Sequence, residues 1–198
     1  MIMNKILYVA TSDIHLATFH LPFLKWLKNE GFNIDIAAEK RGDLSFENVD
    51  KIYYLPFPRS PFNSVYIKTY KNLKKIIKEG NYNLIHCHTP LPSIITRLAA
   101  RTARSKGTVV LYTAHGFHFY KDAPLINWFT YYPIEWLMSR YTDGIITMNK
   151  EDYDYVNHKM MHKYSFIIPG MGVNPNIFKP LPADEKVELR KKLGYSEK

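Results

Sequence analysis

Short apolar stretches alternate with longer amphipathic patterns along most of this chain, and this alternation restricts the possible fold more than any other feature. Residues 5–10 are nearly all apolar, which is typical of a strand buried on both faces of a sheet. Six further strands are predicted at residues 34–38, 51–55, 84–88, 109–113, 144–148 and 165–168. Helical periodicity predicts helices at residues 19–28, 62–79, 93–105, 125–140 and 150–161. The pattern predicts the α/β class, with a doubly wound, mainly parallel sheet of about seven strands.

Two prolines refine the helix predictions. Pro22 suits the first turn of the helix at residues 19–28, where a missing amide proton costs nothing. Pro133 lies inside the pattern at residues 125–140, where it removes a helical hydrogen bond. We therefore expect two helices, or one kinked helix, in that region.

The composition indicates a packed domain without membrane spans or disulfides. The 198 residues are 46% hydrophobic and 15% aromatic, which is ample for a core. No apolar run approaches the roughly 18 residues that a membrane span needs. A single cysteine, Cys87, suits a reducing compartment. We expect a cytoplasmic protein in which Cys87 fills core space.

The chain is basic, with 27 Lys and Arg against 18 Asp and Glu and a formal net charge of +9. Part of the excess lies on one predicted helix, whose lysines are Lys68, Lys71, Lys74, Lys75 and Lys78. They surround an apolar stripe of Tyr66, Tyr70, Leu73 and Ile77. This basic face is either ordinary solvated surface or a contact with an anionic membrane at its cytoplasmic side.

Ligands of doubly wound sheets bind beyond the carboxyl ends of the strands. The loops after the first, fourth, fifth and sixth predicted strands are therefore candidate binding segments. Their candidate substrate contacts are Ser12, Asp13, His15, His88, Thr89, Gly116, His118, Asn149, Lys150 and Glu151. Ser12 and Asp13 are also typical helix caps, and both interpretations stay open. The first loop contains no glycine, which argues against a dinucleotide fingerprint or a P-loop, and we expect no cofactor.

Five of the eight histidines lie in or just after predicted strands: His15, His86, His88, His115 and His118. His86 and His88 share one face of a strand, and His115 and His118 are near each other in a neighbouring loop, so a metal site is one hypothesis. No carboxylate adjoins either pair in sequence. We therefore favour histidines that line a polar cleft, or that are hydrogen-bonded in the core, and predict no metal.

Aromatic residues are concentrated at residues 117–136: Phe117, Phe119, Tyr120, Trp128, Phe129, Tyr131, Tyr132 and Trp136. They either pack in the core or form an exposed apolar surface for a lipid-linked or sugar acceptor. A nucleic-acid surface would mix such rings with many lysines and arginines, and only Lys121 and Arg140 are near. We expect no nucleic-acid partner.

Glycines, prolines and asparagines at residues 170–180 are typical of a linker. A helical pattern with mixed charges follows it. We predict a first domain at residues 1–170, a linker at residues 171–183 and the beginning of a second domain at residues 184–198.

Five motifs occur in a definite order. They are Lys5-Ile-Leu-Tyr-Val-Ala, Leu84-Ile-His-Cys-His-Thr-Pro, Thr113-Ala-His-Gly-Phe-His-Phe-Tyr, Tyr141-Thr-Asp-Gly-Ile-Ile-Thr-Met-Asn-Lys-Glu-Asp and Gly172-Val-Asn-Pro-Asn-Ile-Phe-Lys-Pro. Together they resemble the N-terminal domain of family 4 glycosyltransferases, GT-B enzymes with two facing Rossmann-like domains. The resemblance covers essentially the whole chain and is strongest to bacterial enzymes that build capsular and exopolysaccharide repeat units on a lipid carrier.

The resemblance implies sugar transfer from a nucleotide-sugar donor to a lipid-linked glycan acceptor, with retention of anomeric configuration. His115 matches the histidine that the family places after its fifth strand, so we expect it to be catalytic, either as a base or as a hydrogen-bonding group. The family often has two glycines in its first loop, which this chain lacks. The family's second domain, which grips most of the donor, is also missing from these residues. We expect the fragment to bind acceptor and to be inactive alone.

Two other functions remain open from the residues. A stand-alone, flavodoxin-like module that binds a phosphate ligand or a partner protein would have the same fold class. A metal-dependent hydrolase that uses the paired histidines would contain stoichiometric zinc. The first alternative leaves the linker unexplained, and the second lacks adjoining carboxylates.

Overall fold

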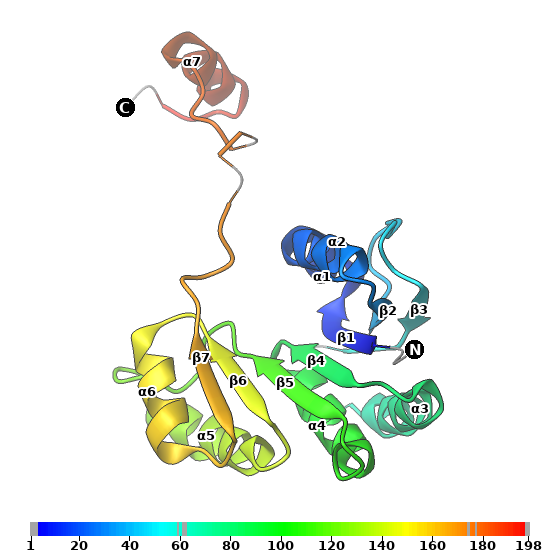
Figure 1. The fold of residues 1–198 in the computed structure, drawn as a ribbon. Helices are drawn as coiled ribbons and strands as arrows, with labels where there is room; N and C mark the ends of the chain where they lie inside the picture. Colours follow the sequence, from blue (N-terminus) through cyan, green and yellow to red (C-terminus); the bar gives the residue numbers. More distant parts are fainter. Residues whose placement is uncertain (1–3, 59, 61–62, 174, 177, 197–198) are drawn as a thin grey trace.

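The structure is a computed structural model that describes residues 4–58, 60, 63–173, 175–176 and 178–196. In these residues seven strands form one sheet, and all neighbouring strands are parallel (Figure 1). The strands are β1 (Lys5–Ser12), β2 (Asn33–Glu39), β3 (Lys51–Tyr54), β4 (Leu84–His88), β5 (Val109–Thr113), β6 (Gly144–Thr147) and β7 (Tyr164–Ile167). Each strand begins within one residue of its predicted position, so the predicted seven-stranded parallel sheet is confirmed.

The strand order is β3-β2-β1-β4-β5-β6-β7. This order, in which the chain reverses its direction of travel between β1 and β4, is that of a Rossmann-like sheet. In sheets of this topology ligands bind in the crevice beside the reversal, which here lies at the carboxyl ends of β1 and β4, because the helices that follow these two strands lie on opposite faces. The topology therefore places the candidate site beside these two strand ends.

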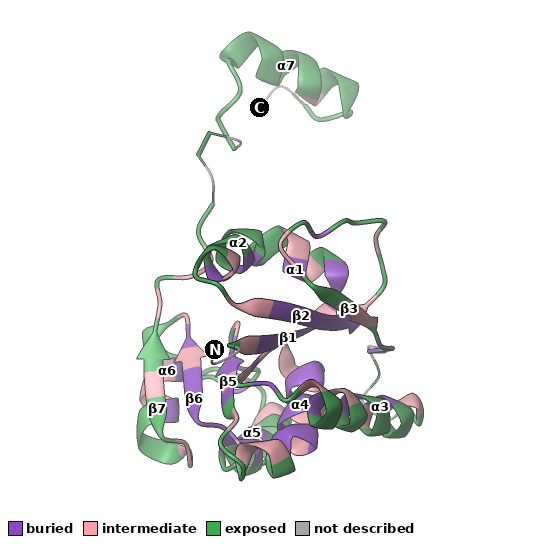
Figure 2. Cartoon of the chain, turned by 45° about the vertical axis from the view of Figure 1, so that its right-hand side comes forward, coloured by how far each residue is buried: buried purple, intermediate pink, exposed green. Residues whose placement is uncertain are grey.

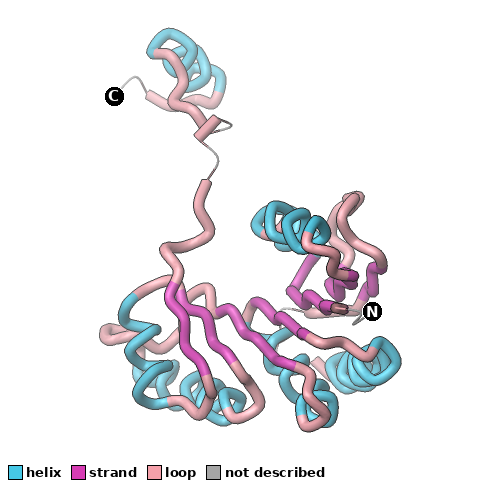
Figure 3. The backbone as a smooth tube through the Cα atoms, viewed as in Figure 1, coloured by secondary structure: helices cyan, strands magenta, loops and turns pink. Residues whose placement is uncertain are grey.

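Seven helices are present in the described residues (Figure 3): α1 (Asp13–Phe19), α2 (Leu21–Asn29), α3 (Val65–Gly80), α4 (Pro90–Arg104), α5 (Leu125–Ser139), α6 (Lys150–Lys159) and α7 (Ala183–Lys192). Pro22 is in the first turn of α2, as predicted. The prediction of a loop after β1 is wrong, because α1 begins at Asp13 with Ser12 as its N-cap. The hydroxyl of Ser12 accepts a hydrogen bond from the His15 amide, which fixes this helix start.

Helix α5 is one continuous helix with Pro133 inside it, so a division into two helices is wrong. The predicted start of α3 at Phe62 lies outside the described residues. So do Asn174 and Ile177 of the predicted linker, and residues 197–198 of the predicted second domain.

The two faces of the sheet are covered by different helices (Figure 1). A large apolar cluster joins one face of the sheet to α3 and α4, with Val156 of α6 and partly buried side chains of α5. A smaller cluster joins the other face to α1 and α2, through Leu16, Leu24 and Leu27. Right-handed crossovers produce this division. The order of strands proceeds from β1 toward one edge of the sheet through β2 and β3, and from β4 toward the other edge through β5, β6 and β7, so the connecting helices lie on opposite faces.

Helices α1 and α2 cover only part of their face. Ile6, Ile34 and Ile36 beneath them are completely buried. On the same face beyond β4, the alternation of side chains presents Leu111, Gly144 and Phe166, and Phe166 is 49% exposed. We call the part of this face under α1 and α2 the covered half, and the part formed by β5, β6 and β7 the open half.

After β7 the chain leaves the sheet, and α7 lies apart from it (Figures 1 and 2). None of the side chains of α7 is buried. The division at residues 170 and 183 stays a prediction. None of the helices in the described part of the chain has the length and apolar character that crossing a bilayer requires.

Candidate functional site

Four histidine rings converge at the crevice between the carboxyl ends of β1 and β4. His15 lies on α1, His20 joins α1 to α2, His88 ends β4, and His115 follows β5. One ring nitrogen from each lies within 4.8 Å of the others. The ring centroids of His20 and His88 are 4.1 Å apart, and those of His15 and His115 are 5.0 Å apart. We call these four residues the histidine cluster.

The sequence predicted three members of the histidine cluster and missed His20. The sequence pattern predicts a loop at residues 11–17 and a helix that begins at residue 19. In that arrangement nothing directs His20 toward the strand ends. The actual turn between α1 and α2 directs His20 back over the crevice, where its Nε2 is 3.4 Å from Nε2 of His15. A helix-capping pattern at Ser12 was the available signal.

Burial keeps the histidine cluster neutral at pH 7. Burial, reinforced by neighbouring imidazoles, lowers the pKa of His15 to about 4 and the pKa of His20 to about 3. Burial and the other imidazoles lower the pKa of His88 well below its usual value, and burial lowers the pKa of His115. Each neutral ring carries one N–H donor and one lone pair.

His88 is the most enclosed member, with 1% of its surface exposed. Neither of its ring nitrogens has a hydrogen-bond partner among the described residues, and the same is true of Nε2 of His115. The ring of Tyr8 stacks on His88 at 5.6 Å between centroids. The site therefore contains three ring nitrogens, on His88 and His115, that have no partner among the described residues, beside the pair formed by His15 and His20.

His86 and His118, which the sequence grouped with the others, lie outside the cluster. His86 shares a face with His88, as predicted, and its Nε2 is 2.8 Å from Oγ1 of Thr113. His118 stacks on Tyr131 of α5, with ring centroids 4.6 Å apart. The structure thus gives His86 a hydrogen-bond partner within the sheet and His118 a contact with α5.

Backbone geometry is unusual on both sides of the histidine cluster. Thr89, directly after His88, has a φ of 64° and a ψ of 147°, which is a costly conformation for a β-branched residue. Its hydroxyl is 2.7 Å from that of Thr11, which links the ends of β1 and β4. Gly116, directly after His115, has a φ of 121° and would place a Cβ in open space. His115 itself is half-buried, and its Nε2 is completely buried.

Asp13 is completely buried and organises the neighbouring loop. Its Oδ1 accepts hydrogen bonds from the amides of Ile14, Arg41 and Gly42, at 2.8, 2.9 and 3.2 Å. Ser12 caps α1, as described above. Both residues thus have the capping or loop-holding role that was one of the two interpretations from sequence.

Asn149, Lys150 and Glu151 begin α6 next to the loop that carries His115. Asn149 is the N-cap of α6, and its Oδ1 accepts the Asp152 amide at 2.8 Å. Lys150 forms an exposed ion pair with Asp154. Glu151 accepts a hydrogen bond from the Lys121 amide. Each of the three side chains therefore already has a partner close by in the structure.

Asp152 was not predicted, and it holds the loop after His115 in place. Its carboxylate accepts hydrogen bonds from the Phe117 amide at 3.1 Å and from Nδ2 of Asn149 at 2.8 Å. Burial raises the pKa of Asp152, although these two bonds oppose the effect. The spacing Asn-x-x-Asp at a helix start was the sequence signal for this arrangement.

Residues 5–149 match the family described as glycosyl transferase 4-like. The chain belongs to this family.

Two curated relatives of this glycosyl transferase 4-like chain are informative. EpsD of Bacillus subtilis (strain 168), which is named as a glycosyltransferase, is 45% identical over 197 residues, or 98% of this chain and 51% of that protein. The UDP-Gal:alpha-D-GlcNAc-diphosphoundecaprenol alpha-1,3-galactosyltransferase of Escherichia coli is 27% identical over 173 residues, or 84% of this chain and 43% of that protein. The chain thus spans about half the length of these relatives.

Solved structures support the same fold. A glycosyltransferase from Rickettsia africae ESF-5 matches 100% of this chain and 51% of its own, with a TM-score of 0.60 and 19% identity. HepE of Anabaena in complex with UDP-glucose matches 96% of this chain and 50% of its own, with a TM-score of 0.59 and 16% identity. At such identities the likeness concerns the fold.

The aromatic segment of this glycosyl transferase 4-like chain contains both buried and exposed side chains, and a role of the exposed ones in acceptor binding stays a prediction. Phe117 and Phe119 are buried and stacked, with centroids 4.7 Å apart. Along α5, by contrast, Leu125, Ile126 and Phe129 are 74%, 64% and 77% exposed. We call these three residues the apolar patch of α5.

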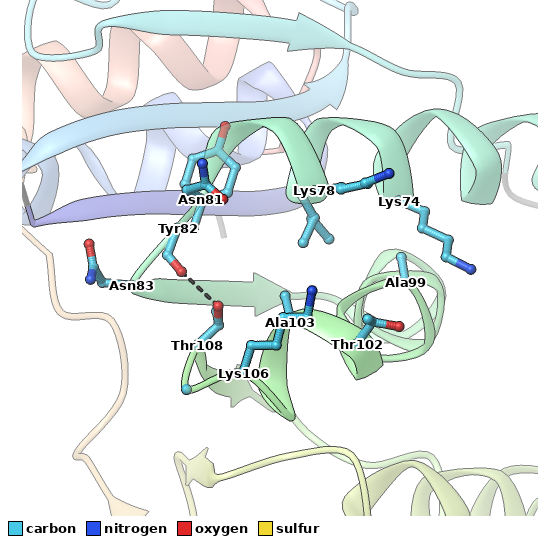
Figure 4. Close-up of a pocket in the computed structure, with 12 residues that line it drawn as sticks. Lys74, Lys78, Asn81, Tyr82, Asn83, Ala99, Thr102, Ala103, Lys106 and Thr108 are labelled. Atoms are coloured by element: carbon cyan, nitrogen blue, oxygen red, sulfur yellow. Dashed lines mark hydrogen bonds between the residues drawn. The ribbon is translucent and has the colours of Figure 1, made fainter.

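A hollow of about 360 Å³ lies away from the histidine cluster, at the other end of the strands (Figure 4). It is next to Asn83 and Thr108, which precede β4 and β5, and Thr108 donates a hydrogen bond to the carbonyl of Tyr82. The lysines around it are Lys74, Lys78 and Lys106. This hollow is therefore separate from the histidine cluster, at the amino ends of the strands.

Proposed function

We propose that this chain is the acceptor-side half of a retaining glycosyltransferase. The complete enzyme moves a sugar from a nucleotide-sugar donor to a hydroxyl of a lipid-linked glycan in capsular or exopolysaccharide synthesis. The observation that carries the proposal is the convergence of His15, His88 and His115 at the crevice of a Rossmann-like sheet, where this topology binds ligands. Family membership supports the chemistry, because the curated relatives are named for glycosyl transfer.

The donor and acceptor classes are supported by the names of similar proteins. The Escherichia coli relative is named for transfer from UDP-Gal to a diphosphoundecaprenol-linked GlcNAc. The structurally similar HepE was solved with UDP-glucose. Nucleotide-sugar and lipid-linked acceptor are accordingly the ligand classes proposed for this chain.

His115 is the proposed catalytic residue. Its Nε2 is buried and has no hydrogen-bond partner among the described residues, so a substrate hydroxyl would supply the hydrogen bond that this nitrogen lacks. A neutral imidazole can accept a proton from the attacking hydroxyl or hydrogen-bond the donor sugar. His88 and Thr89 at the end of β4, and His15 on α1, are proposed to contact the substrate from the other side of the crevice.

The other predicted substrate contacts differ in whether their side chains already form local hydrogen bonds. Gly116 has no side chain and would let a substrate approach its backbone closely. His118 stacks on Tyr131 of α5. Ser12, Asp13, Asn149, Lys150 and Glu151 are proposed to act through the loops and helix starts that they hold.

Two surfaces suit a lipid-linked acceptor at the cytoplasmic face of a membrane. The apolar patch of α5 exposes aliphatic and aromatic side chains next to the loop that follows His115. On α3, the side chains of Lys68, Lys71, Lys74, Lys75 and Lys78 are all exposed, opposite the buried Tyr66, Leu73 and Ile77. We propose that these lysines contact anionic headgroups peripherally.

The domain division is part of the same proposal. Residues 1–170 form the acceptor-side domain, residues 171–183 connect it to a second domain, and residues 184–198 begin that domain. Since the chain spans about half of its curated relatives, the donor-binding wall of the cleft is expected elsewhere. The 198 residues alone should bind acceptor and not turn over.

Transfer assays on the polypeptide extended through the reading frame after Lys198 test the proposal. The extended protein is incubated with radiolabelled nucleotide-sugars and a diphosphoundecaprenol-linked sugar, and the labelled lipid is measured. His115→Ala should lower the rate by about 100-fold or more, as expected for loss of a proton-transfer group. His158→Ala is the matched control, because His158 is an exposed residue of α6 with its Nδ1 2.8 Å from the Asp154 carbonyl.

Transfer at a near wild-type rate by His115→Ala would remove His115 from the mechanism. Failure of the extended wild-type protein with every nucleotide-sugar and lipid acceptor, while it still binds a phosphate ligand, would instead favour the stand-alone binding module.

A further inference from the structure

The histidine cluster has a composition that acceptor binding alone does not require. Four imidazoles from separate segments of the chain direct one nitrogen each to a common point, with all four nitrogens within 4.8 Å. No carboxylate belongs to this group in the described residues. A sugar-binding crevice commonly mixes hydroxyl, amide and carboxylate groups, whereas this point is surrounded by one kind of ligand atom.

His88 provides a second, independent observation. Its side chain is almost completely buried, and both ring nitrogens lack a protein partner. Leaving a buried polar group without a partner is costly, so such groups usually have a ligand or a structural explanation. His88 is directed into the cluster, with its ring 4.1 Å from that of His20 and 5.6 Å from that of His115.

We propose that His15, His20, His88 and His115 form a binding site for one divalent transition-metal ion of the zinc class. Imidazole nitrogen is a preferred ligand of Zn²⁺, Ni²⁺ and Cu²⁺, whereas Mg²⁺ and Ca²⁺ prefer oxygen ligands. The absence of oxygen ligands in the cluster selects the first group. Four neutral imidazoles supply four lone pairs without first losing protons.

One pair of the nitrogens already has the spacing of two ligands on a tetrahedral ion, and all four lie within 4.8 Å of one another. Two ligands at a Zn–N distance of about 2.0–2.1 Å on a tetrahedral centre are about 3.3 Å apart. Nε2 of His15 and Nε2 of His20 are 3.4 Å apart, close to this value. His15 and His115 are only half-buried, which leaves their rings room to rotate toward the buried His20 and His88.

The ion would link α1 and its junction with α2 to the ends of β4 and β5. His15 and His20 belong to α1 and its junction with α2, whereas His88 and His115 follow β4 and β5. Metal binding therefore couples the covered half of the sheet to the ends of β4 and β5. Because His115 is also the proposed catalytic residue, a bound ion and a reacting sugar compete for the same nitrogen.

The experiment is equilibrium metal binding by the purified chain, which does not depend on transferase activity. The protein is stripped with a chelator, titrated with Zn²⁺ or Co²⁺, and its metal content is measured by elemental mass spectrometry. About one ion per chain should be retained, and Co²⁺ should give the intense visible bands of tetrahedral coordination. Zn²⁺ should also raise the midpoint of thermal unfolding, since it binds the folded state.

His20→Gln is the decisive variant, because His20 is not among the proposed sugar contacts. It should bind metal at least about tenfold more weakly than the wild type. His158→Gln is the matched control and should bind as the wild type does. If His20→Gln fails to fold by circular dichroism, His15→Gln replaces it, because His15 is half-buried and less involved in packing.

No retained metal in the wild-type chain overturns the inference. So do equal affinities in the wild type and the folded cluster variant, which would place the metal on surface histidines. Either result leaves the glycosyltransferase proposal intact, because that proposal is judged by transfer in the extended protein.

Discussion

The covered half and the open half belong to one face of one sheet, yet they are built differently. In the covered half, Leu24 of α2 and Ile36 of β2 are completely buried. In the open half, Tyr164 and Phe166 of β7 are 62% and 49% exposed. The histidine cluster lies at the boundary between them. Helices α1 and α2 do not extend over β5 to β7, so these strands are stabilised from the other face of the sheet, where Val110, Tyr112 and Ile145 are buried, and by contacts at their ends.

Polar contacts at the amino ends of the strands supply part of that stability. Asp143, just before β6, accepts hydrogen bonds from the side chain of Arg104 and from the amide of Val110, each at 3.0 Å. Its Oδ1 is also 3.2 Å from Nζ of Lys163. One carboxylate thus links α4, β5 and the start of β7. A comparable contact exists in the covered half, where Asp50 binds Lys28 of α2 and the amide of Ile34, so the open half differs in lacking apolar burial on this face.

The largest expected effect is a difference between matched truncations in the two halves. Leu24→Ala should lower the free energy of unfolding by about 2–5 kcal/mol, because it removes a completely buried side chain and leaves a cavity. Phe166→Ala should cost less than about 1.5 kcal/mol, because half of that ring already contacts solvent. Chemical denaturation of both variants gives the comparison. Equal losses would mean that the open half is covered in solution.

The contrast between the halves also explains what the sequence could and could not predict about the fold. Strands such as β1 were predicted because both faces are buried and the residues are continuously apolar. Helix α1 was missed because only Leu16 and Asp13 of its residues are buried, so no apolar period marks it. Pro133 predicts either two helices or one kinked helix, and the structure has one continuous helix there. The crossing of α1 over β1, which creates the crevice, depends on tertiary packing and not on local pattern.

The second expected effect concerns Asp143. Asp143→Asn should destabilise the chain by about 1.5–3 kcal/mol at pH 7, the range for hydrogen bonds to a charged group. Asp154→Asn is the control, since Asp154 pairs with Lys150 on an exposed helix surface and should cost less than about 0.5 kcal/mol. Urea denaturation of both variants measures the difference. If Asp154→Asn lowers the free energy of unfolding as much as Asp143→Asn does, the contacts of Asp143 with α4, β5 and the start of β7 do not stabilise the chain more than an exposed ion pair.

The loss caused by Asp143→Asn should depend on pH. Burial alone would raise the pKa of Asp143, but hydrogen bonds from Arg104, Val110 and Lys163 outweigh it and hold the pKa below its ordinary value. A lowered folded-state pKa gives stability above the unfolded-state pKa, which is lost as the pH falls through the folded-state pKa. The difference from wild type should therefore be full at pH 7 and shrink below about pH 4. A constant difference would contradict the ionic explanation.

The candidate site was only partly predictable, for a related reason. Topology alone directed attention to the ends of β1, β4 and β5, which correctly brought together His15, His88 and His115. It could not distinguish side chains that face the crevice from those that hold local structure, such as Asn149. His20 was missed because its position depends on the turn after α1. Spacing along the chain does not encode a convergence of side chains from α1 and its junction with α2, from the end of β4 and from the loop after β5.

The smallest expected effect tests strain at the boundary between the halves. Thr89→Gly and Thr89→Ala both remove the hydroxyl that contacts Thr11, so they differ only in the presence of Cβ at a φ of 64°. Glycine adopts this conformation without strain, which favours the folded Gly variant. Its greater conformational freedom in the unfolded chain offsets part of that gain in stability. The Gly variant should therefore be more stable than the Ala variant by about 1 kcal/mol in denaturant unfolding. If the Ala variant is equally stable, the conformation of Thr89 is not strained, and the crevice owes its shape to the packing of α1 and α2 alone.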